Sequence, residues 1–489
     1  RLSVGSVRLS AMGKPFCSII PPYVLERLAQ SDDAELAAHA RRALVVDEHL
    51  RQHRARADAA PTPRKPRVAR GTLEGGPVRL ISDAHGSEDL PGDKVRGEGD
   101  PATHDVAATE AYDGLGDTWH LYAEAFARNS LDDKGLPLRA TVHYGDGYDN
   151  AFWDGTQMVF GDGDGRVFGR FTASLDVIGH ELAHGVTEHT AGLLYQDQSG
   201  ALNESLSDVF GSLVKQKSLG QSADQADWLI GAELLIGDFA GQALRSMKAP
   251  GTAYDNSELG KDPQPATMAD YVETDQDHGG VHINSGIPNR AFYLVATAIG
   301  GNAWAAPGRI WYAALTGPDI AADCDFATFA GLTQAAATQL FGAESSQVQA
   351  VTAAWTEVGV LSATGSDGAI PPSESGSARR KAPKRGPSTD GRTKDSVVAV
   401  SRSGGLVGRT LSRRVALSQL PSKDESAWRD VLSDDRLAEL FELATLEATH
   451  PDRFCYGVAC DQPRVDVSIA EQHLPDRLRR LFDRTLRDG

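Results

Sequence analysis

The stretch "DVIGHELAHGVTEHTAG", residues 176–192, decides how the whole chain is interpreted. It predicts a helix in which His180 and His184, four residues apart, share one face with Glu181 beside them. The pattern H-E-x-x-H is typical of a zinc-binding helix whose glutamate serves as general base. A surface histidine pair gives the same short pattern, so residues elsewhere in the chain decide between the two interpretations.

The composition narrows the class of protein. The 489 residues, 40% of them hydrophobic, are typical of a soluble globular chain of about three domains or lobes. A net charge of -18 argues against a nucleic-acid partner. No apolar run approaches the ~20 residues of a membrane span, so we expect none. No conventional signal peptide is visible, which leaves two expectations: secretion to the extracellular space by an unrecognised route, or a cytoplasmic location.

The character of the chain changes several times before residue 361. Residues 24–57 are rich in Ala, Leu, Glu and Arg and predict one or two helices. The basic, proline-rich stretch 61–71 predicts an exposed segment that a protease can cut. Short β-branched and aromatic runs over 72–174 predict a β-rich lobe, and the alanine-rich segments of 175–361 predict an α-helical lobe.

The last part of the chain reads as a linker and a further domain. Residues 362–396 are rich in Ser, Gly, Pro and basic residues, which predicts a disordered linker. Residues 397–489 regain strand alternation and helical periodicity, so we expect a small α+β domain. Within it, Cys455 and Cys460 could form a local disulfide or remain free thiols.

A third zinc ligand is available on a second predicted helix. Catalytic zinc usually has three protein ligands and one open position for water. The segment "GALNESLSDVFGSL" supplies Glu204, twenty residues after His184. Asp208 follows on the same helical face, and with Asn203 it is a candidate for accepting the second N–H of a ligating histidine.

Four motifs in order resemble the thermolysin-like neutral metalloproteases over residues 75–361. They are "YDNAFWDGTQMVFGDGDG", "VIGHELAHGVT", "TAGLLYQDQSGALNESLSDVFG" and "DHGGVHINSGIPNRAFY". The resemblance implies a two-lobed α+β catalytic domain over 72–361. It also implies that His180, His184 and Glu204 bind Zn²⁺ and that Glu181 takes the proton from the zinc-bound water.

The resemblance assigns further roles around this centre. It implies that His282, held by Asp277, and Tyr195 stabilise the oxyanion that forms during hydrolysis. Six residues are implied to bind the substrate: Asn150 and Ala151 along the peptide backbone, Arg245 at the carbonyl after the cut, and Phe168, Val177 and Leu244 around an apolar pocket. Cleavage before bulky hydrophobic residues is the implied specificity.

One family feature is altered. Thermolysin holds a pair of calcium ions behind the active-site helix, and this chain keeps Asp176 but has Lys215, Leu229 and Ala232 where partners are expected. These side chains cannot replace oxygen ligands, so we expect the double Ca²⁺ site to be absent and Lys215 to pair with Asp176. A single calcium ion elsewhere stays open.

Both ends of the chain carry their own resemblances. "CSIIPPYVLERLA" is similar to the short propeptide of protealysin-like enzymes, which implies that residues 1–71 block the cleft until a cut near 64–76. Cys17 could present a thiolate to zinc or be an ordinary thiol. "SVVAVSRSGGLVGRTLSRRVAL" and "HPDRFCYGVACD" resemble emfourin, which implies a fused inhibitor over 397–489; a module that binds substrates or partners is the alternative.

The sequence therefore predicts a zinc endopeptidase zymogen that acts on proteins or peptides. Its own propeptide and C-terminal domain are the expected intramolecular ligands. A catalytically silent peptide-binding protein of the same fold is the main alternative, and a zinc hydrolase of small amides or esters is a third hypothesis.

Overall fold

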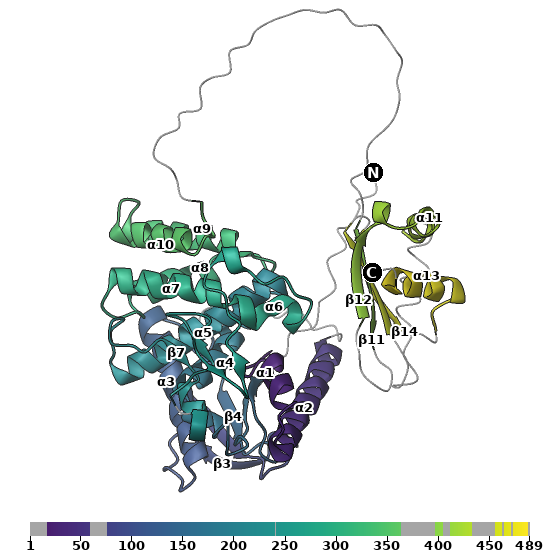
Figure 1. Ribbon diagram of the computed structural model, residues 1–489. Helices are drawn as coiled ribbons and strands as arrows, with labels where there is room; N and C mark the ends of the chain where they lie inside the picture. Colours follow the sequence, from purple (N-terminus) through teal and green to yellow (C-terminus); the bar gives the residue numbers. More distant parts are fainter. Residues whose placement is uncertain are drawn as a thin grey trace, which may run out of the picture. The chain divides into compact units, whose positions relative to one another are not determined.

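The protein is described by a computed structural model (Figure 1). The described residues are 17–58, 76–239, 241–362, 397–403, 411–432, 455–461, 464–470 and 473–487. Two compact units form, Arg1–Ala369 and Ile370–Gly489. The expected cut near 64–76 and the expected linker lie almost entirely outside the described residues. None of the described helices is long and apolar enough to cross a membrane.

The N-lobe is built on a six-stranded mixed sheet in the order β1-β5-β6-β4-β2-β3. The strands are β1 (Cys17–Ser18), β2 (Arg79–Asp83), β3 (Asp93–Gly97), β4 (Leu138–Val142), β5 (Ala151–Trp153) and β6 (Met158–Phe160). Strand β1 comes from the N-terminal segment and pairs antiparallel with β5. Because β1 completes the sheet, residues 17–18 are part of the lobe and cover the edge of β5.

A long helix packs on this sheet, which the β-rich pattern of the N-lobe did not predict. Helix α3 (Val106–Phe126) begins at Asp105, whose carboxylate accepts a hydrogen bond of 3.1 Å from the amide of Ala108. Its interior contains Gly114, and a Cβ there would lie 2.5 Å from Cδ1 of Ile178. Glycine weakens the helical signal in the sequence, yet the close packing of α3 on the next lobe requires it.

The C-lobe is helical, as expected. Helices α4 (Leu175–His189) and α5 (Asp197–Leu219) cross closely, because a Cβ on Gly179 would lie only 2.9 Å from the Cα of Gly211. The remaining helices are α6 (Asp277–Asn284), α7 (Gly286–Ile299), α8 (Ala306–Thr316), α9 (Phe326–Phe341) and α10 (Ser346–Glu357). Helices α6, α7, α8 and α9 contact α5, and α10 packs on α7 and α9 (Figure 1).

Short elements fill the connections around these helices. The strands are β7 (Leu229–Ile230), β8 (Arg245–Ser246), β9 (Asp255–Asn256) and β10 (Gly260–Lys261). The 3₁₀ turns are η1 (Phe171–Ala173), η2 (Ala232–Leu234), η3 (Gly237–Phe239) and η4 (Met268–Asp270).

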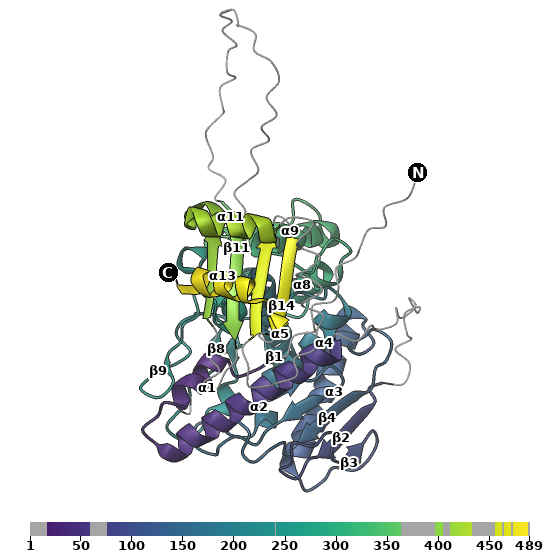
Figure 2. The same ribbon diagram turned by 90° about the vertical axis from the view of Figure 1, so that its right-hand side faces the viewer.

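The N-terminal segment folds onto the catalytic lobes. After β1 it forms α1 (Pro22–Leu28) and α2 (Ala34–Asp58), which lie across one face of the unit (Figure 2). The apolar side of α1 is buried in the same core cluster as the two lobes. Polar contacts fix its position as well, since Asp33 forms an ion pair of 2.7 Å with Arg166.

The C-terminal unit is a small α+β domain with an antiparallel sheet in the order β12-β11-β13-β14. Its elements are β11 (Val397–Ser403), β12 (Leu411–Ala416), η5 (Leu417–Gln419), α11 (Ser422–Val431), β13 (Cys455–Asp461), β14 (Arg464–Ala470) and α13 (Asp476–Arg487). Trp428 on α11 stacks on Phe482 of α13 with ring centroids 5.1 Å apart. Cys460 is buried in the apolar core of this domain.

Candidate active site

Three potential metal ligands converge where α4 crosses α5. The Nε2 atoms of His180 and His184 are 3.1 Å apart, and both rings are buried. In the carboxylate of Glu204, on α5, Oε2 lies 3.5 Å from Nε2 of His180 and Oε1 lies 3.5 Å from Nε2 of His184. The helical spacing of four residues on α4 and the close crossing of the two helices together produce this triangle.

The triangle has the dimensions that zinc requires. Tetrahedral coordination with Zn–N and Zn–O bonds of about 2.0–2.2 Å separates neighbouring ligand atoms by roughly 3.3–3.6 Å. The observed separations of 3.1–3.5 Å are close to this range. In addition, Oε2 of Glu204 is buried without a hydrogen-bond donor among the described residues. The donor set of two imidazoles and one carboxylate therefore fits Zn²⁺.

The far side of each histidine is held by a hydrogen bond. Nδ1 of His180 lies 2.8 Å from Oδ1 of Asp208, and Nδ1 of His184 lies 2.9 Å from Oδ1 of Asn203. With the proton assigned to Nδ1 in both rings, each Nε2 presents a lone pair to the centre. Burial lowers the pKa of His184 to about 4 and so favours the neutral ring, although the charge of Glu204 acts in the opposite direction.

Asp208 also joins the site to two groups beyond the histidines. Burial alone would raise its pKa, but Arg245 and His180 outweigh this effect and hold the pKa of the carboxyl below its usual range. Asn289 donates to Oδ2 of Asp208 at 2.8 Å. The sequence analysis assigned no role to Asn289. Its position within the motif "SGIPNRAFY" was the only available signal.

Glu181 contacts β5 of the N-lobe. Its Oε2 accepts a hydrogen bond of 3.2 Å from the backbone N–H of Trp153. The side chain is fully buried. This carboxylate therefore follows His180 directly on α4 and is bound to the strand that carries the N-terminal segment.

A second group of side chains lies on the opposite side of Glu204. Nδ1 of His282 is 2.6 Å from Oδ1 of Asp277, and its Nε2 is 3.2 Å from the hydroxyl of Tyr195. Burial would lower the pKa of His282, but Asp277 and Glu204 outweigh it and raise the pKa to about 9. Its Nε2 can therefore serve as a hydrogen-bond donor to a developing anion.

His278 is closer to this group than its sequence pattern indicated. Its ring packs edge-on against Tyr195 with centroids 5.6 Å apart, and its backbone lies in the left-handed region with φ 51°. The two following glycines also have positive φ values, so a tight turn precedes His282. The rings of both His278 and His282 pack edge-on against Tyr195.

The residues expected to bind a peptide backbone bind the N-terminal segment of the chain itself. Ile19 donates its N–H to the carbonyl of Ala151 at 3.2 Å, and its own carbonyl accepts from Nη1 of Arg245 at 3.2 Å. Ile20 donates to Oδ1 of Asn150 at 3.0 Å. The described residues therefore contain an extended peptide already seated on β5.

The three apolar residues expected to line a pocket are part of the main apolar core. Phe168, Val177 and Leu244 are all buried and belong to the same apolar cluster as Ile19 and Ile20. Their burial is consistent with an apolar site that the N-terminal segment covers.

Asp47 is a site residue that the sequence did not reveal. This fully buried carboxylate of α2 accepts a hydrogen bond of 3.0 Å from Nδ2 of Asn150 and another from the hydroxyl of Tyr148. The only signal in the sequence is an acidic residue following the apolar run "ALVV". Through Asp47, α2 occupies a polar group that would otherwise be available to a substrate.

Lys215 was expected to replace calcium beside Asp176. Its Nζ is 3.2 Å from Asp176, 3.2 Å from Asp227 and 2.8 Å from Glu233. The ion pair of Asp176 with Lys215 is therefore present. Burial would lower the pKa of Lys215, but the three carboxylates outweigh it and raise the pKa.

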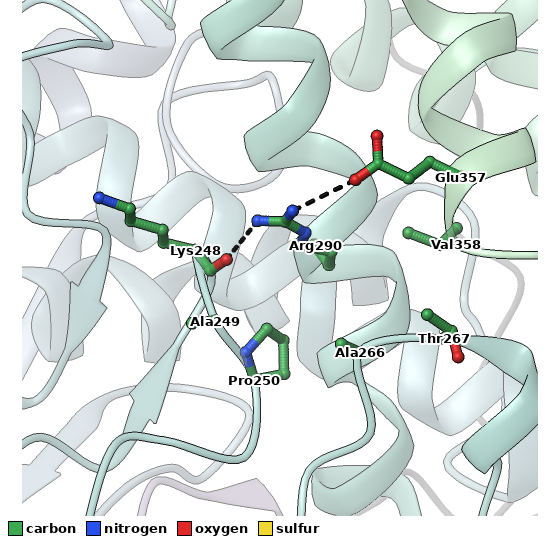
Figure 3. Close-up of a pocket in the computed structure, with 8 residues that line it drawn as sticks. All are labelled: Lys248, Ala249, Pro250, Ala266, Thr267, Arg290, Glu357 and Val358. Atoms are coloured by element: carbon green, nitrogen blue, oxygen red, sulfur yellow. Dashed lines mark hydrogen bonds and ion pairs between the residues drawn. The ribbon is translucent and has the colours of Figure 1, made fainter.

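A pocket of about 350 Å³ lies beside the segment that follows Arg245 (Figure 3). Arg290, on α7, donates to the backbone carbonyl of Lys248 and forms an ion pair of 3.2 Å with Glu357. The amine of Lys248 points away from the pocket (Figure 3). Arg290 thus links α7 and α10 to the segment that carries Arg245.

Comparison with known families agrees with this geometry. Residues 80–188 match the model of the thermolysin metallopeptidase catalytic domain, and residues 191–360 match that of its alpha-helical domain. The chain belongs to the thermolysin family of metallopeptidases. Residues 400–486 match the emfourin family.

Several relatives resemble most of the chain. An extracellular metalloprotease of Pectobacterium carotovorum subsp. carotovorum is 51% identical over 348 residues, which is 71% of this chain and 97% of the relative. Protease PrtS of Photorhabdus sp. (strain Az29) is 48% identical over 70% of this chain and 91% of its own. The structure of the precursor of protealysin, a metalloproteinase from Serratia proteamaculans, superposes with a TM-score of 0.64 at 53% identity, covering 71% of this chain and all of that one. The chain is therefore a thermolysin-family metalloendopeptidase of the protealysin type with an added emfourin domain.

Proposed function

We propose that the protein is a zinc-dependent endopeptidase made as a zymogen, and that residues 1–71 are its propeptide. The observation that carries this proposal is the convergence of His180, His184 and Glu204 beside a peptide seated on β5. In this proposal residues 72–361 are the catalytic domain, 362–396 a linker and 397–489 an inhibitory domain.

The chain's own residues carry most of the reaction. Zinc, when bound by the three ligands, lowers the pKa of a water molecule and polarises the scissile carbonyl. Glu181 takes a proton from the water and delivers it to the leaving amine. His282 and Tyr195 donate hydrogen bonds to the oxyanion, and Asp277 keeps His282 protonated and correctly oriented.

Substrate binding uses the groups that hold the N-terminal segment. Asn150, Ala151 and Arg245 bind the peptide backbone, and Phe168, Val177 and Leu244 surround the side chain that follows the scissile bond. We propose cleavage before bulky hydrophobic residues on this basis, supported by the apolar character of both Ile19 and Ile20 in the same cluster.

Two further properties belong to the proposal. The relative from Pectobacterium is named an extracellular metalloprotease, which supports secretion of this chain as well. The ammonium group of Lys215 occupies the position among Asp176, Asp227 and Glu233 that a cation would otherwise fill, so we propose that the double calcium site is absent.

Casein digestion tests the peptidase proposal. We expect the protein with its propeptide processed to degrade casein, and 1,10-phenanthroline to abolish the activity because it removes zinc. We also expect the Glu181→Ala variant to bind casein fragments without digesting casein. If wild-type protein binds peptides without cutting them, the alternative of a catalytically silent peptide-binding protein replaces the proposal.

A separate comparison tests the inhibitory domain. We expect protein lacking residues 397–489 to digest casein faster than the full chain, and the excised domain to inhibit when added back. Equal rates and no inhibition on adding the domain back would instead favour a module that binds substrates or partners. The described residues of each unit have their own apolar core, which supports separate folding of the two parts.

A further inference from the structure

The N-terminal segment enters the active site in one fixed register. On one side, Trp153 pairs with Cys17 and donates its N–H to Glu181. On the other side, Arg245 binds the carbonyl of Ile19 and also binds Asp208, the partner of the ligand His180. The residues from Cys17 to Ile19 therefore run from the strand residue that binds Glu181 to the guanidinium that binds Asp208, the partner of His180.

Within this span one peptide bond is distinguished by its contacts. Both backbone groups of Ile19 are bound, its N–H by Ala151 and its carbonyl by Arg245. A trans peptide group points its N–H and its carbonyl in opposite directions. Because the N–H of Ile19 points at β5, the carbonyl of Ser18 points away from β5.

We propose that the bond between Ser18 and Ile19 is a cleavage site for the chain's own active site. Hydrolysis breaks the bond from the Ser18 carbonyl carbon to the Ile19 nitrogen. The water oxygen joins the Ser18 carbon, and Glu181 transfers one proton of the water to the Ile19 nitrogen, which leaves as an amine. The second proton passes from the new carboxylic acid to this amine, so the products are the carboxylate of Ser18 and the ammonium group of Ile19. This inference rests on the proposed peptidase function and deepens it.

Cleavage at this bond does not release the rest of the propeptide. Residues after Ile19 remain bound through Asn150, through Asp47 and through the buried face of α1. The product therefore stays in the cleft as a bound inhibitor with a new N-terminus. This event is distinct from the expected activating cut near 64–76, which would separate the propeptide from the catalytic domain.

Mass spectrometry of the purified, zinc-loaded full chain tests the cleavage. We expect a species that begins at Ile19, formed at a rate independent of protein concentration and missing in Glu181→Gln. Ile19→Asp should reduce this species at least tenfold, since it puts a charge in a fully buried position. The matched control Val45→Asp, at a position 69% exposed on the same segment, should leave it unchanged.

A binding measurement tests the register without relying on activity. In the full-length Glu181→Gln chain, we expect slow hydrogen exchange at the amides of Ile19 and Ile20. In the double variant Glu181→Gln, Asn150→Ala, we expect faster exchange at the amide of Ile20. Exchange at both amides as fast as in an unstructured peptide overturns the register and with it the inference.

The two proposals fail in different ways. If the processed protein digests casein but no chain beginning at Ile19 forms at any time, the cleavage inference is wrong and the peptidase function stands. If neither casein nor the Ser18–Ile19 bond is cut by zinc-loaded protein, both are wrong.

Discussion

Arg245 binds both carboxylate oxygens of Asp208, with N–O distances of 2.8 Å for each. The same guanidinium donates to the backbone of Ile19, while Asp208 orients His180. Peptide binding and orientation of a metal ligand are therefore joined through one ion pair. Such a pair is fully buried, so the loss of either partner leaves an uncompensated charge.

Asp208→Asn should weaken zinc binding by roughly 10–100-fold, because the amide no longer fixes His180 as a carboxylate does. Competition with a chromogenic chelator measures this affinity. Asp255→Asn, at an exposed position on β9, is the matched control and should retain wild-type affinity. Equal zinc affinity in both variants would contradict the role of Asp208.

Glu181→Gln should lower kcat of the processed protein by about 10²–10⁴-fold, since it removes the group that accepts the proton of water. Zinc content should stay at one ion per chain because Glu181 is not among the three converging ligands. Metal analysis of the same sample separates the two effects. A variant that loses its zinc would show that the side chain holds the metal instead.

Lys215→Met should destabilise the catalytic unit by about 3–5 kcal/mol, because it leaves buried Asp176 without its cation. The double variant with Asp176→Asn should recover part of this loss, and the free energy of unfolding in urea measures both. Added Ca²⁺ should not stabilise the wild-type chain through Asp176. A calcium-dependent increase of several degrees in the unfolding temperature that disappears in Asp176→Asn would contradict the proposed replacement of calcium by Lys215.

His143 predicts a pH-dependent contribution to stability. Burial would lower its pKa, but hydrogen bonds to Asp162 and Asp105 outweigh burial and raise the pKa to about 8. This pKa is above the value of about 6.5 in the unfolded chain. Protonated His143 therefore stabilises the folded state fully below about pH 6.5, and this stabilisation is lost as the pH rises through 8.

His143→Asn should therefore cost about 1 kcal/mol near pH 6, the scale of a partly exposed ion pair, and almost nothing above about pH 9. Asparagine tolerates the positive φ of 55° at this position, so the substitution isolates the charge. His120→Asn, at a half-exposed position on α3, is the control. A loss of stability that is equal at both pH values would show that the charge of His143 is irrelevant.

Arg290→Ala should raise KM for peptide substrates several-fold with a smaller effect on kcat. The reason is that Arg290 binds the carbonyl of Lys248 and so positions the segment that carries Arg245. Arg290→Lys should restore part of the affinity, since an ammonium can still donate to that carbonyl. A reduced kcat with unchanged KM would instead place its effect on the chemical step.

Much of the fold and of the centre follows from local patterns. The helical spacing of His180 and His184 places them on one face wherever that helix lies, and Glu204 and Asp208 share a face of the next helix for the same reason. The helical C-lobe, the small α+β domain and the family resemblance were also predictable. Helix α3 was not, because its glycines weaken the helical signal while serving the packing against Ile178.

The occupancy of the cleft was decided by the tertiary structure. Sequence resemblance implied that the propeptide blocks the site, but only the folded chain brings Ile20 to Asn150, 130 residues away, and Asp47 to the same side chain. Asn289 likewise reaches Asp208 across 81 residues. Contacts over such separations depend on how whole helices and strands dock, so no local pattern encodes them. The sequence by itself predicted which residues can hold zinc, and the tertiary structure decided that the N-terminal segment lies along β5, because that pairing depends on how whole elements dock.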